Sequence, residues 1–316
     1  MIAIYYKALK KIILEADVKV FDEIDPEEIL WIDLINPSLK EKKALESFLG
    51  TNLTSRQKAE EIESSSRYSE TENLVIANSN FLIQEEDTFT YEPVSFILKD
   101  GILVSMRNAE LRVFDESTRK FQINYKAYPS GFHILVALLE TRIDLDADMV
   151  ESIAREISQV SKRLSLNTDI DEEIILTINQ LQENTMVIRE NIIDKQRVLS
   201  GIMKSERFPS DIYPKLSIML KDVSSLINHT DFSFERLEYL QNTFLGLINI
   251  EQNKIIKIFT VASVVFMPPT LIASVYGMNF KTIPELQWTA GYPFAIGLMI
   301  FSSLLTLYLF RRRKWL

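Results

Sequence analysis

The sequence predicts an α+β domain of mixed helices and strands, mostly helical after residue 131, whose last helix continues into the first of two membrane spans. Three observations point to this organisation. Residues 1–253 hold 28 basic and 43 acidic groups, whereas the remaining 63 residues hold seven basic groups and one acidic group. Two long uncharged apolar runs lie in this last part of the chain. Between Pro214 and Pro268, 53 residues include one glycine and no proline, which predicts one unbroken helix.

Residues 1–130 are expected to form an α/β domain. Ser38 and Glu41 have the spacing of a capping box and predict a helix that ends at Gly50. Asp100-Gly101 is a strong hairpin signal between two runs rich in β-formers. The predicted strands are Ile2–Tyr6, Leu30–Leu34, Asn73–Ile83, Thr90–Leu98 and Ile102–Met106.

Residues 131–208 are expected to form a helical hairpin, because apolar residues recur there at helical spacing. Residues 209–257 are expected to form the stalk helix, with Pro214 in its first turn, where proline is tolerated. The stalk runs into the first apolar segment without a helix breaker. A helix shared by a polar domain and a membrane span can carry a conformational signal between them.

The two apolar runs, Ile258–Phe280 and Leu286–Phe310, each exceed the roughly 20 residues needed to cross a bilayer. We expect spans at 258–276 and 291–310, an outer loop at 277–290 and a basic tail at 311–316. Basic residues flank the inner ends of both runs, so the positive-inside rule puts both termini in the cytoplasm. Residues 1–10 have no long apolar core and predict no secretory signal. The expected location is the plasma (inner) membrane.

The composition excludes several classes of function. The chain has no cysteine and two histidines, which rules out thiolate metal sites, cysteine nucleophiles and histidine-rich metal centres. Its eight glycines are not spaced as in a P-loop or a dinucleotide-binding fingerprint, so we expect no nucleotide site. The acidic body disfavours nucleic-acid binding. We therefore expect neither an enzyme nor a nucleic-acid-binding protein.

One face of the first span carries small polar groups and no charge. A hydroxylated face of this kind is typical of close helix packing in lipid, and that interpretation stays open. The alternative is a pore wall built from several copies of the chain, since two helices cannot enclose a channel. Apolar rings at Ile256 and Met267 would then close the pore by excluding water. The residues of this face are Asn253, Ile256, Thr260, Ser263, Met267, Thr270, Ser274 and Gly277.

The outer end of this span combines a glycine with a neutral amide. Gly277 is expected to make a turn that only glycine adopts cheaply and to expose backbone carbonyls. Asn279 adds an uncharged oxygen. Because Mg²⁺ gives up its water reluctantly, neutral oxygens could accept hydrogen bonds from its hydration shell without stripping it.

The segment Tyr276-Gly277-Met278-Asn279-Phe280, followed by Pro284-Glu285-Leu286, strongly resembles the CorA family of magnesium transporters. The resemblance covers the whole chain, including Asn253–Lys257 and Phe266-Met267-Pro268. It implies a homopentamer whose first spans line a central pore, with Gly277, Met278 and Asn279 as the selectivity filter. Tyr276, Phe280 and Glu285 would support the outer loop. Met267 and Asn253 match the family's constriction and inner mouth, whereas Ile256 stands where methionine is familiar.

The resemblance implies a passive, gated Mg²⁺ channel, with Co²⁺ and Ni²⁺ as further cations. In the family, Mg²⁺ bound between cytoplasmic domains holds the channel shut, and Asp222 resembles a ligand of that kind; a solvated aspartate is the alternative. A zinc transporter of the ZntB type and a non-conducting membrane-anchored sensor remain alternative functions.

Overall fold

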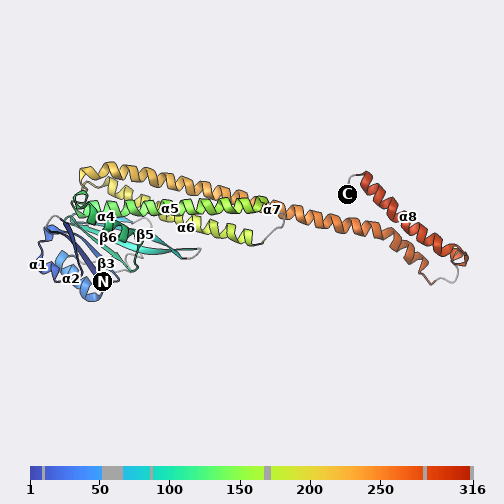
Figure 1. Ribbon diagram of the computed structural model, residues 1–316, viewed down its shortest axis with the longest axis horizontal. Coiled ribbons are helices and arrows are strands. Elements are labelled where there is room, and N and C mark those ends of the chain that lie inside the picture. Colours follow the sequence, from blue (N-terminus) through green and yellow to red (C-terminus); the bar gives the residue numbers. More distant parts are fainter. Residues whose placement is uncertain (9–10, 52–66, 86–87, 167–171, 280–282, 314–316) are drawn as a thin grey trace. The chain divides into compact units, whose positions relative to one another are not determined.

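The computed structural model describes residues 1–8, 11–51, 67–85, 88–166, 172–279 and 283–313 (Figure 1). It divides into two compact units, Met1–Gln241 and Asn242–Leu316. The division falls inside helix α7 (Tyr213–Tyr276), upstream of the predicted boundary between stalk and span. α7 is one continuous helix: the breaker-free stretch between Pro214 and Pro268 is helical as predicted, and the helix also continues through Pro268 and Pro269 to Tyr276.

The first unit contains one seven-stranded sheet with the strand order β2-β1-β3-β7-β6-β5-β4. β3 and β7 pair in parallel, and the other neighbours pair antiparallel. All five predicted strands are present, with ends that differ by up to two residues. The strands are β1 (Ile2–Ala8), β2 (Lys11–Glu15), β3 (Ile29–Ile35), β4 (Tyr68–Thr71), β5 (Leu74–Glu85), β6 (Thr88–Lys99) and β7 (Ile102–Arg107).

Both local signals of the α/β domain are confirmed. The Ser38 side chain accepts a hydrogen bond from the Glu41 backbone, and the Glu41 side chain accepts one from Ser38, so the capping box opens α2 (Leu39–Leu49). Gly50 ends that helix with a left-handed φ of 59°. Asp100 and Gly101 both have positive φ and connect β6 to β7 in a tight hairpin.

The central strand β3 is buried on both faces, which explains its nearly continuous apolar run. On one face, Ile32 and Leu34 pack in a cluster with Leu45 of α2 and Val20 of α1 (Val20–Glu23). On the other face, Trp31 packs edge-on against Phe121 of α4 (Arg112–Ile123). The sheet is therefore the middle layer of three.

Three long helices complete the first unit (Figure 1). They are α5 (Gly131–Leu166), α6 (Glu172–Lys204) and the first part of α7. Ion pairs join them: Lys215 of α7 lies 2.5 Å from Glu140 of α5, and Arg189 of α6 lies 2.7 Å from Asp231 of α7. The short elements η1 (Pro26–Glu28), η3 (Tyr125–Ala127) and η4 (Ser210–Ile212) connect the longer ones.

A buried cluster of charges ties α5 to α6. Asp146 lies between Arg142, whose Nε donates to it at 2.9 Å, and Lys195, whose Nζ is 3.1 Å away. All three side chains are at most 3% exposed. Burial lowers the pKa of Lys195 to about 8, although the Asp146 carboxylate opposes this shift. Because one carboxylate serves two cations, its removal would take from both the counter-charge with which they form an ion pair.

The second unit holds the end of α7, the single turn η5 (Pro284–Gln287) and α8 (Gly291–Arg312). Two helices in the described part of the chain are long and apolar enough to cross a membrane: the one that ends at Tyr276, and α8. Their most apolar windows are 0% and 6% buried, unlike the core helix of a soluble protein. α8 extends two residues beyond the predicted end of the second span at residue 310.

Candidate functional site

The membrane-spanning part of α7 has one face that its own chain covers. Within the second unit, the partly covered residues recur at helical spacing and point toward one side of the helix. They are Val261, Val264, Val265, Pro268, Pro269, Ile272 and Tyr276. This face is apolar, and it identifies the side on which α7 meets the rest of its unit.

The covered face of α8 is built largely from small residues. Gly291 and Ala295 are buried, and the half-covered positions follow at intervals of three or four residues. Small side chains let two helices approach closely in lipid. The hydroxyl of Ser303 donates to the backbone oxygen of Val265 at 3.2 Å, so the covered faces of α8 and α7 meet there. The half-covered residues of α8 are Met299, Ser302, Ser303, Thr306 and Phe310.

The predicted polar stripe lies on the opposite side of α7. At about 100° per residue, its centre is about 150° around the helix from the covered face. Every member is exposed in the single chain: Asn253, Ile256, Thr260, Ser263, Met267, Thr270, Ser274 and Gly277. The stripe therefore does not serve packing against the chain's own second span, and it is open to water or to other copies.

One hydroxyl of the stripe is turned back onto the helix. Thr270 donates its side-chain hydrogen bond to the carbonyl of Phe266 at 2.7 Å. The donor is therefore occupied, and the oxygen retains lone pairs that can accept a hydrogen bond. A hydroxyl in this state suits a water molecule that donates, such as one in the shell of a cation.

α7 ends at the proposed filter in a way that the sequence did not predict. The amide of Gly277 donates to the carbonyl of Ala273 at 2.9 Å, which continues the helical pattern by one residue. The expectation of a turn that only glycine adopts is wrong, because the described glycines with positive φ are Gly50 and Gly101. A Cβ added to Gly277 would make a close contact, 3.1 Å from the Ala273 oxygen.

The other filter and loop residues lie near this end. Met278 is 48% exposed, and Asn279 is exposed as well. Glu285 lies half-buried in η5, and Tyr276 is half-buried at the last residue of α7. Phe280 and Lys314 lie outside the described residues. The structure thus gathers Gly277, Met278 and Asn279 at one helix end.

Asp222 lies far along α7 from this end, on the first unit. It is exposed, next to the buried Val223. Burial raises the pKa of Asp144 on α5, and the carboxylates of Glu140, Asp148 and Asp222 raise it further. The Asp222 carboxylate therefore lies within electrostatic range of Asp144, as do the carboxylates of Glu140 and Asp148 and the ammonium of Lys120. Within the described residues, no group of three or more histidine, cysteine, aspartate or glutamate residues is arranged to hold a metal ion in a single chain.

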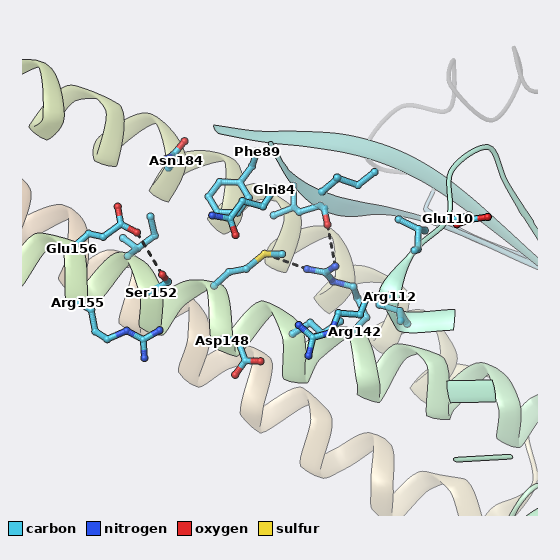
Figure 2. A pocket seen from close by; sticks show the side chains of 17 residues that line it. Gln84, Phe89, Glu110, Arg112, Arg142, Asp148, Ser152, Arg155, Glu156 and Asn184 are labelled. Carbon is cyan, nitrogen blue, oxygen red and sulfur yellow. Dashed lines mark hydrogen bonds between the residues drawn. The ribbon is translucent and has the colours of Figure 1, made fainter. Parts of the chain in front are cut away.

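A pocket of about 490 Å³ is lined by residues of β5, β6, α4 and α5, with Asn184 from α6 (Figure 2). Arg142 reaches its floor and donates to the Leu82 carbonyl at 3.2 Å and to the Met149 sulfur at 3.4 Å. Asp148 and Arg155 lie at its rim, so both signs of charge are present. The pocket brings together none of the predicted site residues.

The sequence reasoning missed Ser303. Its apolar surroundings gave no sign of a contact with α7. The only signal was Pro269, which cannot donate a hydrogen bond to the carbonyl four residues before it. That carbonyl belongs to Val265, the acceptor of the Ser303 hydroxyl.

Known proteins resemble this chain over nine-tenths or more of its length. The Magnesium transport protein CorA of Wolinella succinogenes is 38% identical over 293 residues, which cover 91% of each chain. The protein of the same name from Campylobacter jejuni strain RM1221 is 36% identical over 329 residues, covering 100% of both chains.

The fold has a counterpart among solved structures. The complete structure of the CorA magnesium transporter from Methanocaldococcus jannaschii matches with a TM-score of 0.85, covering 100% of this chain and 99% of that one at 20% identity. The family model described as CorA-like Mg²⁺ transporter protein matches residues 26–312. With these matches, and with two exposed apolar helices long enough to span a membrane, the chain belongs to the CorA family.

Proposed function

We propose that this chain is a passive, gated Mg²⁺ channel of the plasma (inner) membrane. The observation that carries the proposal is the exposed, uncharged polar stripe of α7, which lies opposite the face covered within its own chain. Membership of the CorA family and its relatives' role as magnesium transport proteins support Mg²⁺ as the cargo. Five copies, as the family resemblance implies, would turn their stripes toward a common axis.

The stripe suits a cation that keeps its water. Gly277 and Met278 offer backbone carbonyls beyond the last helical turn, and Asn279 offers an amide oxygen. Neutral oxygens bind a hydrated divalent ion more weakly than carboxylates would, so the ion can leave again. Thr260, Ser263, Thr270 and Ser274 continue with hydroxyl oxygens below the filter.

Two apolar positions interrupt the stripe and would act as gates. Ile256 and Met267 are 60% and 65% exposed in the single chain. Rings of such side chains around an axis would exclude water when the helices approach one another and would block a hydrated ion. Asn253 forms the inner mouth of this pore.

The membrane potential is enough to drive entry. A divalent cation gains about 4.6 kcal/mol for each 100 mV of inside-negative potential, twice the value for a single charge. No nucleotide is therefore required. The basic residues Lys254, Lys257 and Arg311–Arg313 border the spans on one side, which favours both termini in the cytoplasm.

Closure by cytoplasmic Mg²⁺ is the proposed regulation. Asp222 lies within electrostatic range of Asp144 on α5, and the body of the chain carries a surplus of negative charge. Mg²⁺ between neighbouring copies would reduce the repulsion between acidic faces. At low Mg²⁺ these faces would separate, and the continuous helix α7 would transmit the movement to the span.

The test is cation uptake into proteoliposomes, with Mg²⁺, Co²⁺, Ni²⁺ and Zn²⁺ offered separately. Asn279→Ala should lower Mg²⁺ uptake strongly. Gln287→Ala removes an exposed amide from the nearby turn η5 and serves as the matched control, with uptake like wild type. Full Mg²⁺ uptake by Asn279→Ala would refute the filter. Uptake of Zn²⁺ alone would identify a zinc transporter, and no uptake of any cation would identify a sensor.

A further inference from the structure

Two successive prolines interrupt the hydrogen bonding of α7 within its membrane-spanning part. Pro268 and Pro269 lie inside the helix, and neither has a backbone N–H. The carbonyls four residues earlier, those of Val264 and Val265, therefore lose their helical donors. In lipid no water replaces such a donor, so a freed carbonyl needs a partner from within the protein.

The second span supplies that partner for Val265. The Ser303 hydroxyl on α8 donates to the Val265 oxygen at 3.2 Å, and both residues are partly buried. Its neighbour Ser302 behaves differently, because its hydroxyl donates to the Met299 carbonyl within α8 at 2.8 Å. Of these two adjacent serines, one therefore serves its own helix and the other joins the two helices.

We propose that Ser303 is a positioning residue for the pore-lining helix, which it holds through the carbonyl freed by Pro269. The hydrogen bond from Ser303 to Val265 lies beside Met267 and Thr270, where the two prolines remove two backbone hydrogen bonds of the helix. It fixes α7 against α8 at the level of the proposed constriction, and so fixes the direction in which the stripe faces. This role rests on the proposed Mg²⁺ channel.

The bond has a signature that ordinary packing lacks. Pro269→Ala restores an N–H that can donate to the Val265 carbonyl, so in that variant the carbonyl no longer depends on Ser303. The effects of Ser303→Ala and Pro269→Ala should therefore be coupled. If Ser303 only filled space, its removal would cost the same in both backgrounds.

The first measurement is amide hydrogen exchange, followed by mass spectrometry, of the full-length protein in lipid nanodiscs. Ser303→Ala should speed exchange in residues 266–273 about threefold, corresponding to about 0.6 kcal/mol for a hydrogen bond between membrane helices. Ser303→Thr, which keeps the hydroxyl, should exchange like wild type, as should Ser302→Ala. In the Pro269→Ala background, Ser303→Ala should add no increase. Equal increases in both backgrounds, or an increase with Ser302→Ala of the same size, would overturn the assignment.

The second measurement is Mg²⁺ uptake by the same variants in proteoliposomes. Ser303→Ala should lower the rate about threefold, and Ser303→Thr should restore it. Faster exchange without a change in uptake would overturn the positioning role. A wild-type protein that transports no Mg²⁺ would instead refute the proposed function. The hydrogen-exchange comparison would still decide whether the hydrogen bond from Ser303 to Val265 holds α7 in place.

Discussion

Gly291, the first residue of α8, should not tolerate a side chain. It is buried, and its amide donates to the Trp288 carbonyl at 3.0 Å. A Cβ added to Gly291 would lie 2.2 Å from the carbonyl oxygen of Glu285 in η5. That atom belongs to the backbone, so it cannot turn aside as a flexible side chain would. Gly291→Ala therefore forces the turn and the helix apart.

The size of this effect follows from the geometry. An ordinary contact begins at 3.4 Å, so the two backbones must separate by about 1 Å. Overpacking of this kind costs about 1 to 3 kcal/mol, and the midpoint of thermal unfolding should fall by about 2 to 10 °C. Because Glu285 follows the proposed filter by six residues, Mg²⁺ uptake should fall as well.

Gly297 provides the matched control in the same helix. A Cβ at this position meets nothing within 4 Å, and alanine favours a helix over glycine by up to about 1 kcal/mol. Gly297→Ala should therefore leave the thermal midpoint and Mg²⁺ uptake unchanged or slightly raised. The assay is thermal unfolding of the detergent-solubilised protein, monitored by tryptophan fluorescence, beside proteoliposome uptake. Equal midpoints for the two variants would refute the packing argument.

Three further predictions concern the first unit, Met1–Gln241. Because the folded pKa of Lys195 is about 8 and its ordinary value is 10.5, the unfolded chain binds more protons between these values. The contribution of Lys195 to the free energy of unfolding, measured by urea titration, should therefore increase as pH rises from 8 to 10.5. Lys195→Met should abolish this increase; a pH profile unchanged by the substitution would contradict the prediction. Asp146→Asn should lower the free energy of unfolding by about 3 to 5 kcal/mol, because two buried cations lose their partner. Its thermal midpoint should fall further than that of any variant with a single exposed carboxylate removed. Millimolar Mg²⁺ should protect the first unit from protease, and Asp222→Asn should need more Mg²⁺ for equal protection; identical titrations would exclude Asp222 from regulation.

Much of the fold could be predicted because the signals were local. The capping box at Ser38, the turn at Asp100-Gly101 and the missing breakers along α7 each act within a few residues. The parallel pairing of β3 with β7 was out of reach, since the buried partners Asp33 and Arg107, 2.8 Å apart, are distant in the sequence. Helix α4, with its buried Phe114 and Phe121, was also missed.

In the candidate site, too, local patterns could be predicted from the sequence, whereas contacts between helices could not. Helical spacing alone placed the polar residues on one face of α7, and the structure adds that α8 covers the other face. The contact of Ser303 with Val265 depends on how two helices meet, which no periodicity reports. At Gly277 the identity of the residue suggested a special turn, whereas its φ is not positive and its amide continues the helical hydrogen bonding to Ala273.

The most direct test of the pore is the accessibility of single cysteines, since the natural chain has none. Ser274→Cys places a thiol on the stripe, and Ala273→Cys places one at almost the same depth but about 100° around the helix. Both positions are exposed in the single chain. A positively charged thiol reagent added outside should block Mg²⁺ uptake through Ser274→Cys and leave uptake through Ala273→Cys unchanged. Uptake that survives complete labelling at 274, or a block at 273 alone, would contradict a pore lined by this face of α7.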